Sequence, residues 1–297
     1  MLQHLRLMSS NLLGWRTKRK IVVFESDDWG SIRMPSLKVY DELRNLGVNV
    51  HTGDNNRYNQ LDTIESKADM EMLFNSLSSF RDVNGNHPVF TAMSLCANPD
   101  FEQIKQADFS EYYFEPVTRT FEKYGNSAAL VLWKQGEAQK IFVPEFHGRE
   151  HLNVYVWLKA LKTKHNPTIE AFNRGFWGFK PDLPYISTYQ AAFDLVNESA
   201  LVFHKSVIDS GIELFEELHG RKPVYFVPPN GPINTQIEEY AASKGFKYIC
   251  SGKIHKEPLG EGKYKKHLRY IGLRNPMGAV FLTRNCFFEP SFRGKGF

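Results

Sequence analysis

Short apolar runs alternate along the chain with longer stretches in which apolar residues recur every three or four positions. The first pattern is typical of buried strands, and the second is typical of amphipathic helices. We expect strands at residues 21–24, 88–95, 141–146, 224–227, 248–250 and 279–282. We expect helices at residues 36–47, 64–80, 154–161, 203–218 and 234–245. Because strands and helices alternate, the pattern predicts an α/β fold with mostly parallel strands and outer helices.

Three segments fit neither pattern. Residues 51–59 are polar and are predicted to form a long loop, whereas residues 166–189 carry the Gly, Pro and aromatic residues of an ordered loop. Residues 101–139 give no assignment. Since the sequence shows no repeat, low-complexity segment or clear linker, we expect a single domain over residues 1–297.

The first apolar run leads directly into Glu25, Asp27 and Asp28. Carboxylates crowded at the end of a buried strand repel one another unless a cation or a donor compensates them. The carboxyl ends of parallel strands are also where α/β folds keep their chemistry. Acidic residues are common in turns and helix caps as well, so this stretch alone leaves both interpretations open.

Two histidines, His147 and His151, follow the third predicted strand. A spacing of four places both imidazoles on one face of a helix or helical turn. Two histidines and one carboxylate form a common ligand set for a divalent metal, and Asp28 would complete it. With ten histidines in the chain, a coincidental pair is the alternative.

Composition narrows the functional classes. The net charge of 37 − 33 = +4 comes without a basic block, which argues against nucleic acid as a partner. Three well-separated cysteines form neither a disulfide framework nor a zinc-finger spacing. The N-terminus has no apolar segment of signal-peptide length, and no stretch approaches a membrane span, so we expect a cytoplasmic protein.

These motifs resemble those of the polysaccharide deacetylases, the carbohydrate esterases that act on chitooligosaccharides and peptidoglycan. Residues 24–30, FESDDWG, resemble the first motif of that family, and residues 147–151, HGREH, carry both histidines of the second. The resemblance implies a distorted, seven-stranded (β/α) barrel. It also implies that Asp27 is the general base and that Asp28, His147 and His151 bind the metal.

The third family motif is matched in part by residues 227–231, VPPNG. Asn230 replaces an aromatic residue, and Val227 stands where the family has an arginine that pairs with the catalytic aspartate. Either Arg284 or Arg174 takes over that pairing, or the aspartate does without an arginine. By resemblance, we expect substrate contacts from residues in and around these motifs. These residues are Trp29, Pro229, Asn230, Gly231 and Arg284.

The last family motif, Leu-x-His, supplies a general acid and is missing. Residues 281–285, FLTRN, end in Asn285, and no histidine follows His267. We therefore expect the sequence to be truncated at its C-terminus, with the acid beyond residue 297.

The resemblance implies a metal-dependent hydrolase that removes an acetyl group from an N-acetylated sugar or polysaccharide precursor. Zinc is the expected metal, although cobalt, nickel or iron accept the same ligands. One alternative is hydrolysis of a non-sugar linear or cyclic amide, because the aromatic loop at residues 172–179 also suits a flat heterocycle. The other is a non-catalytic carbohydrate-binding protein, favoured by Val227 and by the missing histidine. The sequence leaves the oligomeric state open.

Overall fold

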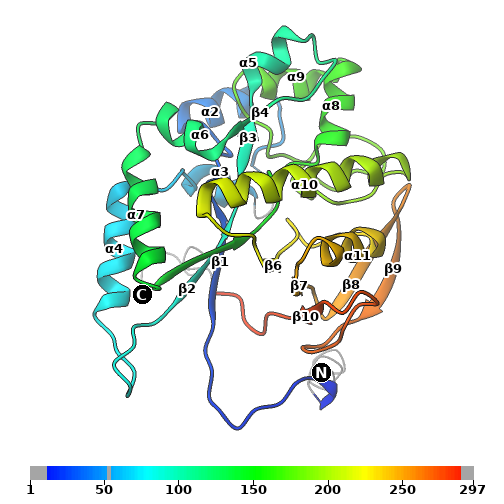
Figure 1. The fold of residues 1–297 in the computed structure, drawn as a ribbon. Helices are drawn as coiled ribbons and strands as arrows, with labels where there is room; N and C mark the ends of the chain where they lie inside the picture. Colours follow the sequence, from blue (N-terminus) through cyan, green and yellow to red (C-terminus); the bar gives the residue numbers. More distant parts are fainter. Residues whose placement is uncertain (1–11, 52–54, 289–297) are drawn as a thin grey trace.

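The computed structural model describes residues 12–51 and 55–288, and in this part of the chain six parallel strands form one curled sheet (Figure 1). The sheet order is β1-β2-β5-β6-β7-β10. The strands are β1 (Phe24–Trp29), β2 (Phe90–Ser94), β5 (Phe142–Phe146), β6 (Tyr225–Phe226), β7 (Tyr248–Cys250) and β10 (Val280–Leu282). Because all of them are parallel, their carboxyl ends meet at one end of the sheet.

The predicted α/β architecture with outer helices is confirmed, but the sheet of the described residues has six strands rather than the expected seven. The first and last strands, β1 and β10, form no strand pair with each other. They are joined by side chains instead, because Arg284, two residues after β10, contacts Glu25 and Asp27 of β1.

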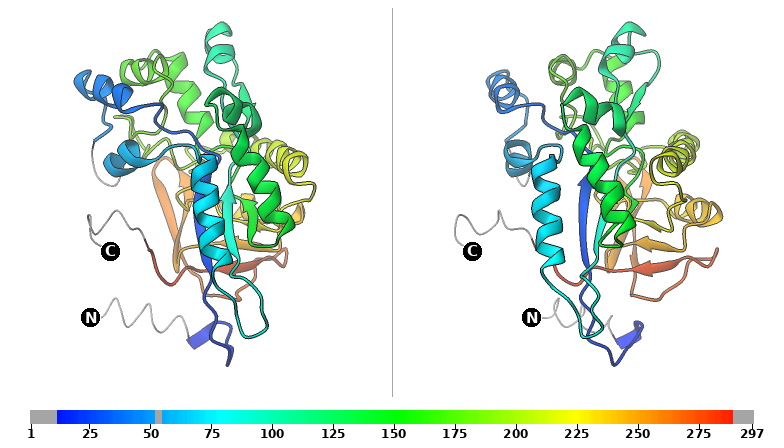
Figure 2. Two further views of the ribbon diagram at one scale, coloured as in Figure 1. Left: turned by 90° about the vertical axis from the view of Figure 1, so that its left-hand side faces the viewer. Right: turned by 60° about the vertical axis from the view of Figure 1, so that its left-hand side comes forward.

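Helices cover the sheet on its outer side (Figure 2). The long helices α4 and α7 lie side by side over β1 and β2, and α10 and α11 pack together over the central strands. The helices are α2 (Leu37–Asn45), α3 (Asn55–Leu61), α4 (Lys67–Ser78), α5 (Phe101–Gln106), α6 (Val117–Lys123), α7 (Ser127–Ala138), α8 (Val154–Lys162), α9 (Asn166–Phe172), α10 (Ser199–His219) and α11 (Thr235–Ser243). Aromatic side chains fill much of the core between the layers.

Local sequence signals account for several helix ends. Ser36 caps α2 by accepting a hydrogen bond from the Val39 N–H, and Asn234 caps α11 through the Gln236 N–H. Gly220 ends α10 in the left-handed conformation, at a φ of 69°. These helices confirm the predicted segments to within a few residues.

The first strand differs from its prediction. Residues 21–23 are exposed, and β1 begins at Phe24, where β2 first pairs with it through Phe90. An apolar run forms a strand only where a neighbour supplies hydrogen bonds, so Asp27 and Asp28 lie inside β1 rather than in a turn after it.

The segments without a confident prediction are mostly ordered. The polar loop predicted at residues 51–59 contains the start of α3. Residues 101–139 hold α5, α6, α7 and the short strand β4 (Phe114–Pro116), which pairs antiparallel with β3 (Ala97–Pro99). The segment at 166–189 begins as α9 and then buries aromatic side chains.

A hairpin that the sequence pattern did not predict joins β7 to β10. It consists of β8 (Ile254–Gly260) and β9 (Lys263–Leu268). β9 carries three lysines, so its apolar pattern is weak. None of the helices in the described residues is long and apolar enough for a membrane span. Residues 1–11 of the basic N-terminal arm and the C-terminal residues 293–297 lie outside the described residues.

Candidate metal centre

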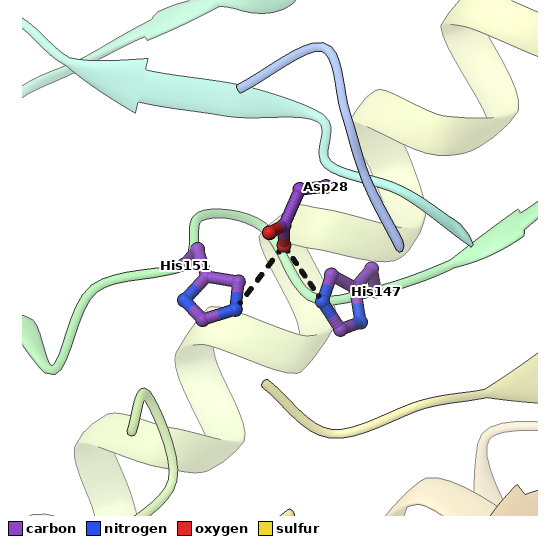
Figure 3. A group of neighbouring side chains, drawn as sticks. All are labelled: Asp28, His147 and His151. Carbon is purple, nitrogen blue, oxygen red and sulfur yellow. Dashed lines mark ion pairs between the residues drawn. The ribbon is translucent and has the colours of Figure 1, made fainter. Parts of the chain in front are cut away.

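Three side chains converge at the carboxyl end of the sheet (Figure 3). Oδ1 of Asp28 lies 3.2 Å from Nε2 of His147 and 3.2 Å from Nε2 of His151. One ligand atom from each residue lies within 4.8 Å of the others. The structure therefore brings together the three residues that the sequence pattern proposed as metal ligands.

An irregularity in β1 places Asp28. The register with β2 shifts between Ser26 and Trp29, and Asp28 itself adopts a left-handed conformation with a φ of 71°. Such a conformation is uncommon outside glycine, although Asp tolerates it better than most residues. The local twist turns the Asp28 carboxylate toward the two histidines (Figure 3).

The histidines do not lie on a helical turn, so the sequence-based expectation for this element is wrong. They lie in the loop between β5 and α8, where Gly148 has a φ of 108° that breaks helical geometry. Neighbouring backbone fixes the loop, because the Arg149 carbonyl accepts hydrogen bonds from the Cys96 and Ala97 N–H groups. The spacing of four thus brings the imidazoles together through a folded loop.

Each histidine has a support behind it. Nδ1 of His147 lies 2.7 Å from the Val227 carbonyl oxygen, so this nitrogen donates its proton there and leaves Nε2 to face Asp28. The His151 ring stacks on Trp177, with ring centroids 6.3 Å apart. The indole Nε1–H of Trp177 in turn donates to the Ile32 carbonyl.

Electrostatics keep the carboxylate ionised. Burial would raise the pKa of Asp28, but His151, Arg33 and His147, which face the carboxylate, hold it well below its ordinary value. Burial lowers the pKa of His151 to about 4. For His147 burial acts the same way, but the charges of Asp27 and Asp28 outweigh it and the pKa is raised.

Asp27 is held by an arginine. Arg284 donates from Nη1 and Nη2 to the two carboxylate oxygens of Asp27, at 2.6 Å each, and from Nε to Glu25 at 2.9 Å. Burial opposes ionisation of Asp27, but the Arg284 hydrogen bonds and the charges of His147 and Arg284 leave its pKa lowered. Arg174, the other expected partner, pairs instead with Glu42 and Glu170.

The other proposed substrate contacts lie on different sides of the centre. The ring of Trp29 packs on Phe90, Trp133 and Phe142, between the sheet and its helices. Pro229 lies against the histidine loop, close to Gly148. Asn230 and Gly231 form the turn after β6, with φ values of 54° and 88°. A role of these residues in substrate binding stays a prediction.

Sequence reasoning missed three parts of the centre. Arg33 pairs with Asp28, the Val227 carbonyl orients His147, and Trp177 supports His151. Of these three, only Arg33 could have been found from the sequence, because it is a cation five residues after the crowded carboxylates. The other two contacts depend on long-range folding.

The donor set fits a divalent metal. In the described part of the chain, Asp28 Oδ1 and His147 Nε2 are buried without a hydrogen-bond partner, although they face each other at 3.2 Å. Buried polar atoms are normally satisfied, so unpaired lone pairs aimed at one point are typical of a cation site. Two imidazoles and a carboxylate are ligands that zinc accepts, with positions left for water and substrate.

The fold and this centre define an α/β protein with a candidate Asp–His–His metal site. The sequence model of glycosyl hydrolase family 57 matches residues 187–286, about a third of the chain. Among curated protein sequences, none matches the chain significantly.

Several solved structures are similar at low identity. A polysaccharide deacetylase from Bacillus cereus has 10% identity and a TM-score of 0.36 over 89% of this chain and 62% of its own. An α-amylase from Thermotoga maritima has 10% identity and a TM-score of 0.40 over 89% and 45%. A de-N-acetylase from Aggregatibacter actinomycetemcomitans has 10% identity and a TM-score of 0.33 over 77% and 86%. This chain therefore spans less than two thirds of the first two proteins, and similarity at this level transfers no activity.

Proposed function

We propose that this protein is a metal-dependent hydrolase that removes an acetyl group from an N-acetylated sugar or polysaccharide precursor. The observation that carries the proposal is that two adjacent aspartates, Asp27 and Asp28, have different partners. Asp28 faces His147 and His151, whereas Asp27 is clasped by Arg284. These different partners support a metal-binding role for Asp28 and a proton-accepting role for Asp27.

Asp28, His147 and His151 would hold the divalent metal, with zinc the expected ion. A metal of this kind polarises an acyl carbonyl and lowers the pKa of a bound water. Asp27 would accept the proton of the attacking water as general base. Arg284 fixes the orientation of Asp27 and, by the family resemblance, would take the role of the arginine that Val227 replaces.

The order of events also requires a proton for the leaving amine. The Leu-x-His motif that supplies this acid in the resembling family reads Leu282-Thr283-Arg284 here, without the histidine. We therefore expect slow turnover, because departure of the amine limits the rate.

Hydrolysis of a glycosidic bond is the second candidate, and the match to glycosyl hydrolase family 57 over residues 187–286 favours it. Such enzymes use a pair of carboxyl groups on either side of the scissile bond. The reaction products distinguish the two candidate functions, because a glycosidase releases a new reducing end and a deacetylase releases acetate.

The test measures acetate and reducing ends released from N-acetylated oligosaccharides by zinc-loaded and chelator-treated protein. We expect acetate from the loaded protein only, and its loss in Asp27→Asn. Asp108→Asn serves as the control, because Asp108 is exposed and pairs only with Lys164 among the described ion pairs. Reducing ends without acetate, or acetate formation that survives Asp27→Asn, would contradict the deacetylase proposal.

A further inference from the structure

Asp28 has a partner that the candidate ligand set does not explain. Nη2 of Arg33 lies 2.5 Å from Oδ2 of Asp28, whereas the other carboxylate oxygen, Oδ1, faces both histidines. The Arg33 side chain is only 4% exposed. A charged hydrogen bond this short in a buried place restricts the carboxylate strongly.

Surrounding groups hold Arg33 in place. Its guanidinium lies over the ring of Tyr58, with Cζ 5.4 Å from the ring centroid, and its Nη1 lies 3.8 Å from Oδ2 of Asp62. The aliphatic part of the side chain fills the space above Gly178, where a Cβ would come within 2.6 Å of Cγ of Arg33. Glycine is thus needed at 178 because Arg33 occupies the room.

The same support reaches the second histidine. Trp177, next to Gly178, donates to the backbone carbonyl of Ile32 and stacks on the ring of His151. The segment at 177–178 therefore fixes Arg33 on one side and His151 on the other. Contacts thus run from Arg33 through Asp28 and His151 to Trp177, and Trp177 returns to the backbone at Ile32, next to Arg33.

We propose that Arg33 is a positioning residue that limits Asp28 to a single metal-binding oxygen, Oδ1. An aspartate whose two oxygens are both free can bind a metal through both of them. Because Arg33 occupies Oδ2, the centre keeps a lower protein coordination number and more positions for water and substrate. This inference rests on the metal site of the proposed function.

Metal affinity alone does not test the proposal. Loss of an outer partner weakens metal binding about 10- to 100-fold in known sites. Loss of the positive charge of Arg33 would instead strengthen metal binding, because it removes a repulsion between the guanidinium and the divalent metal. The number of Asp28 oxygens that bind the metal reports on the role of Arg33, because it does not depend on the balance of these two effects.

The experiment compares the cobalt-loaded wild-type chain with Arg33→Met, Arg33→Lys and Arg174→Met. Crystal structures of the cobalt-loaded proteins give the distance from cobalt to each Asp28 oxygen, and visible absorption reports the cobalt geometry. We expect both Asp28 oxygens to bind cobalt in Arg33→Met, and only Oδ1 to bind it in the wild-type chain. Arg33→Lys keeps a charged donor and is expected to retain the wild-type spectra. Arg174→Met removes an arginine that pairs with Glu42 and Glu170, away from the centre.

A single bound Asp28 oxygen in Arg33→Met overturns the inference, and so do two bound Asp28 oxygens in Arg33→Lys or Arg174→Met. If Arg33→Met does not fold, Gly178→Ala is the second test, since its new Cβ is expected to displace Arg33 from Asp28. Two bound Asp28 oxygens in that variant support the role, and one bound oxygen refutes it. A wild-type chain that binds no cobalt contradicts the metal site itself, which is a different result.

Discussion

Replacement of Arg284 by methionine tests whether this residue holds the first and last strands of the sheet together. The substitution removes three charged hydrogen bonds to Asp27 and Glu25 and leaves two acids near each other without their cation. The Arg284 side chain is 23% exposed and that of Asp27 is 32% exposed, so the cluster is neither fully buried nor a surface pair.

The expected loss of stability lies between two limits. Breaking a buried ion pair costs about 3–5 kcal/mol, and an exposed pair contributes at most about 1 kcal/mol. With about a quarter to a third of these side chains exposed, we expect Arg284→Met to lower the free energy of unfolding by about 2–3 kcal/mol. For a urea m-value of about 3 kcal/mol/M, the unfolding midpoint falls by about 0.7–1 M.

The effect has a defined pH dependence. The pKa of Asp27 is lowered in the folded protein, and the group stabilises the fold above its ordinary pKa of 3.8. This contribution is lost as the pH falls through the folded-state pKa, because Asp27 then becomes protonated in both states. The difference between wild type and Arg284→Met is therefore full at pH 7 and shrinks below about pH 4.

Urea unfolding followed by circular dichroism at pH 7 and below pH 4 measures this difference. Arg174→Met is the control for loss of an arginine outside the cluster. A midpoint for Arg284→Met within about 0.2 M of wild type at pH 7, which corresponds to about 0.6 kcal/mol, would refute the reasoning.

Three further changes test other parts of the account. Asp27→Asn is expected to lower the rate of acetate release about 10²- to 10⁴-fold, since it removes the general base. Zinc affinity, measured by competition with a chelator, is expected to stay at the wild-type value. Loss of zinc binding would mean that Asp27 is a ligand. His204, buried in α10 with neither ring nitrogen hydrogen-bonded in the described part of the chain, has its pKa lowered to about 4 by burial. In the unfolded chain His204 takes up a proton near its ordinary pKa of 6.5, so its contribution to the free energy of unfolding falls by roughly 3 kcal/mol from pH 7 to pH 4. In His204→Leu this contribution is absent, so the urea midpoint should depend less steeply on pH over that range. A midpoint that falls as steeply as in the wild-type chain contradicts the prediction. Gly136→Ala would place a Cβ 2.3 Å from Cζ of Phe74 and 2.8 Å from Cβ of Phe142, so thermal unfolding should show a loss of about 1–3 kcal/mol, whereas Gly252→Ala, with only ordinary contacts, should match wild type.

Sequence patterns predicted the candidate ligands because parallel strands bring their carboxyl ends together. Asp28 is the next-to-last residue of β1, and His147 directly follows β5, two places along the sheet, so the topology brings them to the same end of the sheet. The spacing of His147 and His151 suggested a helix, but Gly148 and the hydrogen bonds of the Arg149 carbonyl fold the segment into a loop. The histidines meet in either geometry.

Other features depend on long-range partners that the sequence does not reveal. The apolar residues 21–23 are exposed because no strand of the described residues pairs with them, although their pattern is that of a buried strand. Arg284 and Arg174 were equal candidates for pairing with Asp27, since only the position of β10 in the sheet separates them. The hairpin of β8 and β9 escaped prediction because its lysines hide the apolar alternation. A single domain over residues 1–297 stays a prediction.

The central claim is that Asp28, His147 and His151 bind one divalent metal. An anomalous-scattering map of crystals grown with zinc tests it most directly. The account predicts a single strong peak about 2 Å from Asp28 Oδ1 and from Nε2 of both histidines. Density for the three side chains in this arrangement, without an anomalous peak between them, would contradict the metal site and with it the proposed hydrolase.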